Sequence, residues 1–363
     1  MENLNRKYIY PALAKHLQIN ENCVLATVVE THGSTPQKPG SSAIFGVDGL
    51  LEGTVGGGNV EFIIQKKAAE ALKTKKSGYY RFDLNNEIDA EDSVICGGGM
   101  NILVDATPEK HLPVFSALTK SLKKRVPGVL VTMAGTDSQG NFEIEWFWVE
   151  KDNTELIDSR FDTGLKQEIN AMFEKSEKGK FAEIVRHTSP LFEDNYVFLE
   201  SIVPLPRLLI AGAGHVGKVL AHIGKLLDFE VTVWDDRAEY ANYENIPDAD
   251  HLLSGNLADT LGKITPGADT FIVIVTRGHK NDSEVLKQFI STGTGYIGMI
   301  GSRKKIVQVR EQFIKEGWAT AEQWDKIHAP IGLNINSKTV QEIAVSIAAQ
   351  LVQERYRLYN ENE

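Results

Sequence analysis

Short apolar runs separated by segments of helical period characterise the second half of the chain. The run at 208–211 is followed by a segment with helical spacing and then by a second apolar run at 231–234. Further on, residues 270–275 form an uninterrupted apolar run, as expected for a strand covered on both faces of a parallel sheet. This alternation predicts an α/β domain with a parallel sheet and helices on both of its faces.

Weaker patterns complete this half of the chain. Further strands are predicted at 251–254 and 296–300, and helices at 256–264, 283–290, 302–315 and 339–356. Ser337 precedes the last helix, and we expect it to be the N-cap because serine accepts hydrogen bonds from first-turn amides.

The first half alternates less regularly and predicts a separate mixed α/β, or α+β, domain. Asp48-Gly49 between two apolar runs indicates a hairpin. Helices are predicted at 5–17, 59–76, 108–126 and 163–175, and strands at 24–30, 42–47, 50–54, 100–105, 128–134, 142–149, 181–186 and 196–203. Pro204 and Pro206 disfavour helix and strand pairing. The predicted domains are therefore 1–204 and 205–363.

A glycine motif joins the first strand and helix of the second domain. Gly212 permits a tight turn, Gly214 lets backbone approach a pyrophosphate, and Gly217 allows close helix–strand packing. The helix start at His215 offers free N–H groups and a positive dipole end to an anion. Asp235 ends the second strand, where a carboxylate accepts from ribose hydroxyls. Together these elements predict a Rossmann-type nucleotide or pyrophosphate site.

The motif has two other interpretations. In the first, the domain is a Rossmann fold whose glycines serve packing alone. In the second, the spacing from Gly212 to Lys218 is a P-loop, but Val219 stands where Ser or Thr would hold magnesium. The sequence therefore does not favour an NTPase.

Composition narrows the classes of protein. A chain of 363 residues suits two domains, and 42% hydrophobic with 24% charged residues is typical of soluble globular proteins. No apolar run reaches the roughly 18 residues of a membrane span, and the start lacks a signal-peptide core, so we expect a cytoplasmic protein without membrane association. A net charge of −10 argues against nucleic-acid binding.

Glycines precede a helix a second time in the first domain. Gly56, Gly57 and Gly58 lead into the helix predicted at 59–76 and form a candidate anion cradle. The alternative is a tight strand-to-helix turn, with Glu61 as part of either arrangement.

A basic block and a polar loop in the second domain are further candidates for ligand contact. Ser302, Arg303 and Lys304 combine a helix start, a hydroxyl and cations, a setting that suits phosphate. The alternative is a capped helix with a solvated basic turn. His279 lies in the polar segment 276–282, where ligand contact and loop structure are both compatible with the sequence.

The chain has two cysteines, too few for a disulfide framework or a Cys-rich zinc site. Cys96, followed by Gly97 and Gly98, has a thiol among backbone N–H groups that would lower its pKa. Such a thiol suits a nucleophile, a persulfide carrier or a soft metal ligand. The alternative is a small buried hydrophobe, which is also the role expected of Cys23.

Several catalytic signatures are missing from the sequence. It contains no Gly-x-Ser-x-Gly, His-Glu-x-x-His, Cys-x-x-Cys or Tyr-x-x-x-Lys. A Rossmann dehydrogenase would therefore need another proton relay, for which His279 and His215 are the candidates.

Taken together, these features resemble one family, the XdhC/CoxI accessory proteins of xanthine dehydrogenase and related molybdenum hydroxylases. The matching stretches are ATVVETHGSTPQKPGSSAIF (26–45), EGTVGGGNVE (52–61), CGGGMNILVD (96–105), LLIAGAGHVGK (208–218), TRGH (276–279), GYIGMIGSRKK (295–305) and HAPIGLNINSKTVQEIAVSI (328–347). They span both halves of the chain. Family members often carry Cys or His where this chain has Asn59, which leaves Cys96 as the thiol.

The resemblance implies a maturation factor rather than a metabolic enzyme. Such a factor binds the molybdenum cofactor, supports its sulfuration and delivers it to an apo-hydroxylase, working as a homodimer and with a cysteine desulfurase. In this hypothesis the 212–217 loop, with Arg303 and Lys304, receives the phosphate end. Cys96 then faces molybdenum across the inter-domain cleft, near the Gly56–Gly58 loop.

Two functions compete with this hypothesis. One is an NAD(P)-dependent oxidoreductase of undescribed substrate, for which Asp235 favours NAD over NADP. The other is a scaffold that uses the fold for contacts alone.

Overall fold

The structure is a computed structural model that describes residues 6–84, 98–151, 161–177, 181–185, 192 and 195–360. Cys96 and Gly97 lie outside this range. The chain divides into two compact units, Met1–Pro204 and Leu205–Glu363, each of which is described by itself. Within the described residues, no helix has both the length and the apolar character that a membrane crossing requires.

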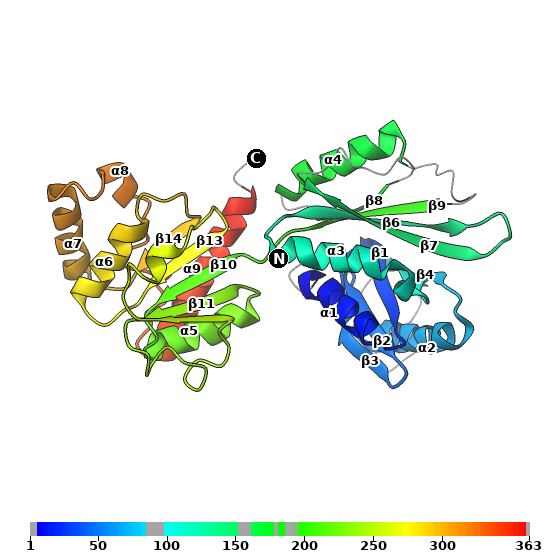
Figure 1. Ribbon diagram of the computed structural model, residues 1–363, viewed down its shortest axis with the longest axis horizontal. Helices are drawn as coiled ribbons and strands as arrows, with labels where there is room; N and C mark the ends of the chain where they lie inside the picture. The colour runs from blue at the N-terminus through cyan, green and yellow to red at the C-terminus, as the bar shows by residue number, and fades with distance from the viewer. Residues whose placement is uncertain are drawn as a thin grey trace. The chain divides into compact units, whose positions relative to one another are not determined.

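Unit 1 contains an antiparallel sheet that the α2 helix covers on one face (Figure 1). Its strand order is β3-β2-β1-β5-β4. The elements are β1 (Val24–Gly33), β2 (Ser42–Gly46), β3 (Gly49–Gly53), α2 (Gly58–Thr74), β4 (Gly78–Asp83) and β5 (Gly98–Asp105). The predicted hairpin is present, with Gly46 opposite Gly49. Strand β4 was not predicted.

A second antiparallel sheet, ordered β7-β6-β9-β8, gives unit 1 a layered arrangement. Helices α1 and α3 pack between the two sheets, and α4 packs on the outer face of the second sheet (Figure 1). The elements are α1 (Arg6–Gln18), η1 (Pro108–His111), α3 (Leu112–Lys123), β6 (Gly128–Thr136), β7 (Phe142–Glu150), α4 (Thr163–Glu177), β8 (Ala182–Val185) and β9 (Asn195–Ile202).

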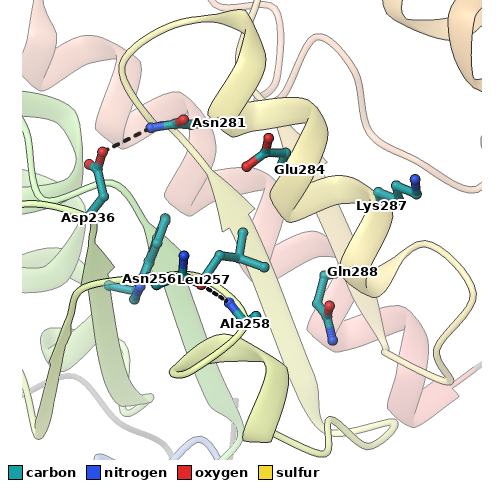
Figure 2. A pocket seen from close by; sticks show the side chains of 9 residues that line it. Asp236, Asn256, Leu257, Ala258, Asn281, Glu284, Lys287 and Gln288 are labelled. Carbon is teal, nitrogen blue, oxygen red and sulfur yellow. Dashed lines mark hydrogen bonds between the residues drawn. The ribbon is translucent and has the colours of Figure 1, made fainter.

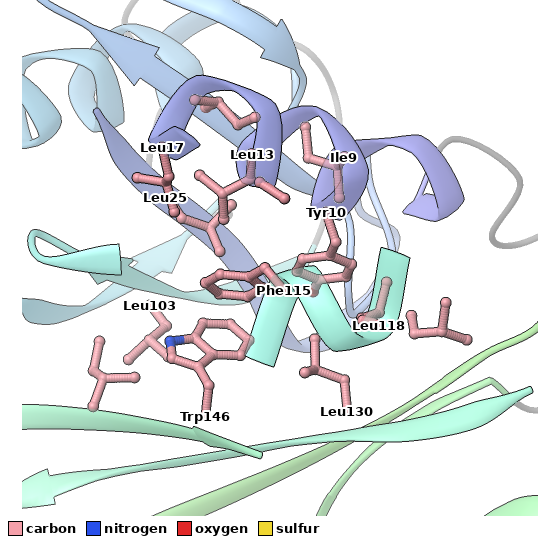
Figure 3. Packing of buried hydrophobic residues seen from close by; sticks show 14 of the residues in the cluster. Ile9, Tyr10, Leu13, Leu17, Leu25, Leu103, Phe115, Leu118, Leu130 and Trp146 are labelled. Carbon is pink, nitrogen blue, oxygen red and sulfur yellow. The ribbon is translucent and has the colours of Figure 1, made fainter. Parts of the chain in front are cut away.

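An aromatic cluster joins these layers (Figure 3). Tyr10 of α1 stacks on Phe115 of α3 at 5.9 Å between ring centroids, and Trp146 of β7 meets Phe115 edge-on at 5.5 Å. The polar ends of the rings are paired: Tyr10 donates to Glu200 at 2.6 Å, and Trp146 Nε1 donates to Asp105 at 2.8 Å. Burial raises the pKa of the Asp105 carboxyl despite this bond.

Unit 2 is a five-stranded parallel sheet with helices on both faces, as predicted (Figure 1). Its order, β12-β11-β10-β13-β14, is 3-2-1-4-5 within the unit, so the winding direction reverses between β10 and β13. The strands are β10 (Arg207–Ala211), β11 (Glu230–Asp235), β12 (His251–Ser254), β13 (Thr270–Ile274) and β14 (Tyr296–Met299). Ligands of such sheets bind at the carboxyl ends of the strands near this reversal.

Helices α5 and α9 pack on one face of this sheet, and α6, α7 and α8 pack on the other. Their bounds are α5 (His215–Leu226), α6 (His279–Phe289), α7 (Arg303–Lys315), α8 (Ala321–Trp324) and α9 (Val340–Asn360). Helix α6 begins at His279, so this residue opens a helix instead of lying in the expected loop. The helix predicted to begin at 283 is therefore longer at its N-terminus.

Two predicted features of unit 2 are wrong. Residues 256–264 form turns and the short η3 (Leu261–Lys263) instead of an α-helix. Asn256 Oδ1 accepts from the Ala258 amide at 2.9 Å, and such local bonds compete with helix formation. The N-cap of α9 is Thr339, not Ser337, because Thr339 and Glu342 exchange side-chain and backbone hydrogen bonds at 3.2 and 2.8 Å.

The buried bond between Trp146 and Asp105 gives a stability prediction. Trp146→Phe leaves the buried Asp105 carboxylate without one donor, so we expect the free energy of unfolding to fall by about 1–3 kcal/mol. The packing lost with the smaller ring lowers it further. Trp148→Phe is the matched control, because its indole donates to the neutral Ser121 hydroxyl at 2.9 Å in a half-buried setting. Equal losses in urea unfolding would contradict the role given to the Asp105 bond.

Candidate functional site

The glycine loop at the end of β10 is shaped by close contacts at two of its three glycines. A Cβ on Gly212, whose φ is +122°, would lie 2.4 Å from the Val275 carbonyl oxygen. A Cβ on Gly217 would lie 1.8 Å from the Gly212 carbonyl oxygen, so α5 packs tightly on the loop. A Cβ on Gly214 would meet nothing within 4 Å. Gly214 therefore borders open space at the start of α5.

The first turn of α5 has the features of an anion site. Gly214 is the N-cap and has no side chain to occupy the first amides, and the first turn contains no acidic residue. His215, the first helical residue, is exposed. Helix dipole and free amides together favour negative charge at such a position. The arrangement agrees with the predicted phosphate position, which stays a prediction.

Asp235 is buried beside this loop, 3% exposed, and its carboxylate is already paired. It accepts from the Ala213 amide at 2.9 Å, from the Arg237 amide at 3.1 Å and from Arg237 Nε and Nη2 at 2.8 and 3.1 Å. Burial alone would raise the pKa of Asp235, but the bonds from Arg237 and Ala213 outweigh it, and the pKa lies below its ordinary value. Asp235 therefore holds the loop in place. Its predicted ribose contact would require a hydroxyl to displace or share Arg237.

A second buried carboxylate links loops on the β13 side of the reversal point, at the ends of β13 and β14. Its hydrogen bonds are called the Asp282 brace here. Asp282 of α6 is fully buried and accepts from the Thr276 amide and hydroxyl at 3.1 and 2.6 Å. Lys305 of α7 donates to the same carboxylate and to the Ile300 carbonyl oxygen, the latter at 3.1 Å. The brace ties the loops after both strands together. This pairing was not predicted from the sequence, although Asp282 lies in the polar segment 276–282 and Lys305 directly follows the basic residues Arg303 and Lys304.

The other residues of the basic block are exposed. Ser302 caps α7 by accepting a hydrogen bond from the Lys305 amide at 3.3 Å. Arg303 and Lys304 are exposed to solvent. Their contribution to phosphate binding stays a prediction. The side chain of His279 lies outside the described residues, so its role as a ligand or relay is untested.

The Gly56–Gly58 loop of unit 1 is braced from within. Thr54 donates to Glu61 at 2.6 Å and accepts from the Gly56 amide at 3.1 Å. Gly56 and Gly58 have φ values of +140° and +62°, and a Cβ on Gly57 or Gly58 would meet nothing within 4 Å. The loop is open, but the Glu61 carboxylate in the first turn of α2 opposes an anion there.

Near the sequence position of Cys96, the structure describes Gly98 onward. A Cβ on Gly98 would lie 2.4 Å from the His32 carbonyl oxygen, so this glycine is needed for close strand packing. The predicted thiol site falls on residues that the structure does not describe. Cys23 is buried, and burial followed by the Glu21 charge raises the pKa of its thiol to about 12, as expected of a structural cysteine. Within the described ranges, His, Cys, Asp and Glu form no cluster of three that suits a metal ion.

A cavity of about 590 Å³ in unit 2 is lined by residues at the ends of β11 and β12 and by residues of α6 (Figure 2). Asp236 stands in its wall next to the buried Asp235, and its carboxylate accepts from Asn281 Nδ2 at 3.3 Å. The remaining lining residues are Trp234, Asn256, Leu257, Ala258, Glu284, Lys287 and Gln288. The sequence signal for this wall was the second of two consecutive aspartates after the strand.

The chain therefore combines two units. A layered unit with one glycine loop comes first, and a Rossmann-type unit with an open glycine loop follows it. The chain belongs to the XdhC and CoxI family. The family model of that description matches residues 16–83, and the model described as the XdhC Rossmann domain matches residues 208–351. Both units therefore carry the family's features.

Two curated relatives and one solved structure show the extent of the likeness. A Bacillus subtilis (strain 168) protein, named as a probable subunit of xanthine dehydrogenase, is 24% identical over 347 residues, 94% of this chain and 96% of that protein. "Uncharacterized protein YqeB" of Escherichia coli (strain K12) is 34% identical over 152 residues, which cover 41% of this chain but only 27% of that protein. A crystal structure described as a xanthine dehydrogenase from Bacillus halodurans shares the fold, with a TM-score of 0.72, 23% identity and coverage of 95% of each chain.

The pairing of Asp235 gives a prediction for stability and its pH dependence. We expect Asp235→Asn to lower the free energy of unfolding by about 1.5–3 kcal/mol near neutral pH, the usual contribution of hydrogen bonds to a charged group. Because the pKa of folded Asp235 lies below the unfolded value of about 3.9, its stabilisation is complete above that value and is lost as pH falls through the folded pKa. In urea titrations, the difference in free energy of unfolding between wild type and Asp235→Asn should shrink in acid, whereas exposed Glu239→Gln should not differ from wild type. A difference that stays constant in acid would refute this assignment.

Proposed function

We propose that this protein is an accessory factor that binds the molybdenum cofactor, supports its sulfuration and delivers it to a molybdenum hydroxylase of the xanthine dehydrogenase type. The observation that carries the proposal is the family membership of both units. The name of the Bacillus subtilis relative, which aligns along nearly the whole chain, supports a link to xanthine dehydrogenase. We expect the apo-hydroxylase, a cysteine desulfurase and a second copy of the chain as partners.

The phosphate end of the cofactor suits unit 2 better than unit 1. Both units present glycines and a helix start next to open space, at Gly214 and at Gly57. The first turn of α2 contains Glu61, whereas the first turn of α5 contains no acid. Because a helix N-terminus stabilises an anion and a neighbouring carboxylate repels it, the start of α5 is the better phosphate site. Exposed Arg303 and Lys304 would add positive charge.

The molybdenum end requires a soft donor, and Cys96 is the residue proposed for it from sequence. A thiolate would hold the metal, or it would take over the terminal sulfur of a persulfide on the cysteine desulfurase, which is left as a thiol, and so carry sulfur for the sulfuration. The other cysteine, Cys23, is buried with a raised pKa and is therefore a poor nucleophile.

Substitution at Gly214 tests the phosphate position. Gly214→Ala should fold normally, because its φ of −76° suits alanine and the new Cβ meets no protein atom. The methyl group would, however, occupy the space that a phosphate needs. We expect molybdenum cofactor binding in equilibrium dialysis to weaken about tenfold or more, equivalent to about 1.4 kcal/mol. Gly293→Ala, at another open glycine, is the control, and equal affinity in both variants would exclude this phosphate site.

Substitution at Cys96 tests the sulfur role separately. Cys96→Ser should keep cofactor binding, since the phosphate contacts lie in unit 2, but should lose at least about nine-tenths of the activation of an apo-hydroxylase, because an alcohol is a far weaker soft ligand than a thiolate. Cys23→Ala should retain activation. Full activation by Cys96→Ser would remove the thiol from the mechanism.

An NAD-dependent oxidoreductase is the second candidate function. The strand order and glycine loop of unit 2 favour it, since this arrangement binds dinucleotides in many enzymes. Cofactor transfer to an apo-hydroxylase identifies the accessory factor, whereas hydride transfer between NAD and a substrate identifies the oxidoreductase. Neither activity would indicate a scaffold.

A further inference from the structure

Helices α5 and α9 lie side by side on one face of the parallel sheet of unit 2, and α6, α7 and α8 cover the other face (Figure 1). The two helices run in the same direction. Near the end of α9, Arg355 Nη1 donates to the carbonyl oxygen of Leu227, the residue that ends α5, at 2.7 Å. The pair therefore has a long seam between its two members, and the outer side of this seam faces away from the sheet.

Helix α9 carries an apolar stripe beside this seam. Its members follow one another at intervals of four, three and four residues, the spacing of side chains that face a partner helix, and are Val345, Ala349, Val352 and Tyr356. Val345 and Tyr356 are 50% and 64% exposed, and the two residues between them are half-buried. At 1.5 Å per residue, the stripe is roughly 16 Å long. The core of unit 2 is contacted by another side of α9, which contains Ala344, Ile347, Ala348 and Leu351.

Helix α5 contributes three more apolar residues with the same kind of spacing. Val219 and Ile223 are half-buried against the core, and Leu226 is 71% exposed. Together with the stripe on α9 they are called the α5–α9 seam, which consists of Val219, Ile223, Leu226, Val345, Ala349, Val352 and Tyr356. Exposed apolar patches of this kind mark sites of protein contact.

The charged side chains of α5 lie on its opposite flank. Lys218 donates to Asn245 at 3.2 Å, and Lys225 is paired with Asp250. Both partners belong to the segment that leads into β12, on the side of α5 away from α9. The apolar flank of α5 is therefore the one beside α9, and the seam contains no charged side chain.

The absence of charge from the seam suits contact with an identical surface. In a two-fold symmetric contact the same patch of both subunits meets itself, so a charge near the axis faces its own equivalent and is repelled. The chain has a net charge of −10, and its surface on average therefore repels a second copy. The α5–α9 seam lacks this repulsion and offers apolar side chains on both sides of the contact.

The composition of the seam also argues against the acceptor of the cofactor as its occupant. A delivery partner has to be released, and interfaces of transient complexes are about as polar as the rest of a protein surface. Interfaces between identical subunits are more apolar and contain fewer charges at their centre. The seam, with six aliphatic residues and one tyrosine, has the second kind of composition.

We propose that the α5–α9 seam is the surface through which two copies of this chain bind each other. The inference deepens the proposed function, on which it rests for the expectation of a second copy, by assigning the contact to a surface. The seam begins at Val219, more than one helical turn after the N-cap Gly214. Each copy therefore keeps its own anion site at the start of α5.

Sedimentation equilibrium of the full-length protein tests the surface. Wild type should be a dimer at micromolar concentration. Val345→Glu and Leu226→Glu should each raise the dissociation constant of the dimer about tenfold or more, because each places a carboxylate in an apolar contact. Val307→Glu is the matched control, since Val307 is 55% exposed on α7, on the other face of the sheet, and it should dimerise like wild type. A monomeric wild type, unchanged dimerisation of either seam variant, or an equal loss in Val307→Glu would overturn the inference.

Activation of an apo-hydroxylase by the same variants separates the other possible occupant from the second copy. If the hydroxylase occupies the seam, Val345→Glu should lose activation while its dimer stays as tight as that of wild type, and this result would overturn the inference. A wild type that activates the hydroxylase as a monomer would overturn this inference alone. A dimer that Val345→Glu disrupts, but that never activates the hydroxylase, would overturn the proposed function alone.

Discussion

The buried carboxylate of Asp235 is the constraint on which unit 2 depends. A carboxylate that is only 3% exposed must be paired, because an unpaired buried charge is costly. Asp235 meets this requirement with the Ala213 amide and the Arg237 guanidinium, and so links the end of β11 to the loop after β10. The loop is thereby held with the amides of α5 uncovered. The same pairing removes Arg237 from ligand binding and leaves Asp236 as the accessible acid.

Paired carboxylates also hold other loops of the molecule in place. Asp282 and Lys305 form a buried ion pair, and with Thr276 they link the loops at the ends of β13 and β14. In unit 1, Thr54 and Glu61 brace the second glycine loop. That brace places a carboxylate beside the helix start. Two loops that look alike in sequence therefore differ in the ligand charge that they favour.

The fold could be predicted largely from apolar periodicity, whereas the site could be predicted only in outline. Alternating runs such as 208–211 and 270–275 indicated a parallel sheet because such strands are covered on both faces. β4 was missed because Gly78–Asp83 mixes aromatic and charged residues on a half-exposed edge strand. The segment 256–264 has apolar spacing, but its polar side chains bond to local backbone and stop the helix. Sequence spacing identified an acid after β11, but tertiary contacts decide which of Asp235 and Asp236 is buried.

The central claim is that the amides at the start of α5 bind the phosphate of the delivered cofactor. Hydrogen–deuterium exchange of the protein with and without bound molybdenum cofactor measures this contact at the loop itself. The account predicts slower exchange of the amides between Gly212 and Gly217 in the loaded protein. A complex that demonstrably holds the cofactor, yet exchanges these amides at the rate of the free protein, would contradict it.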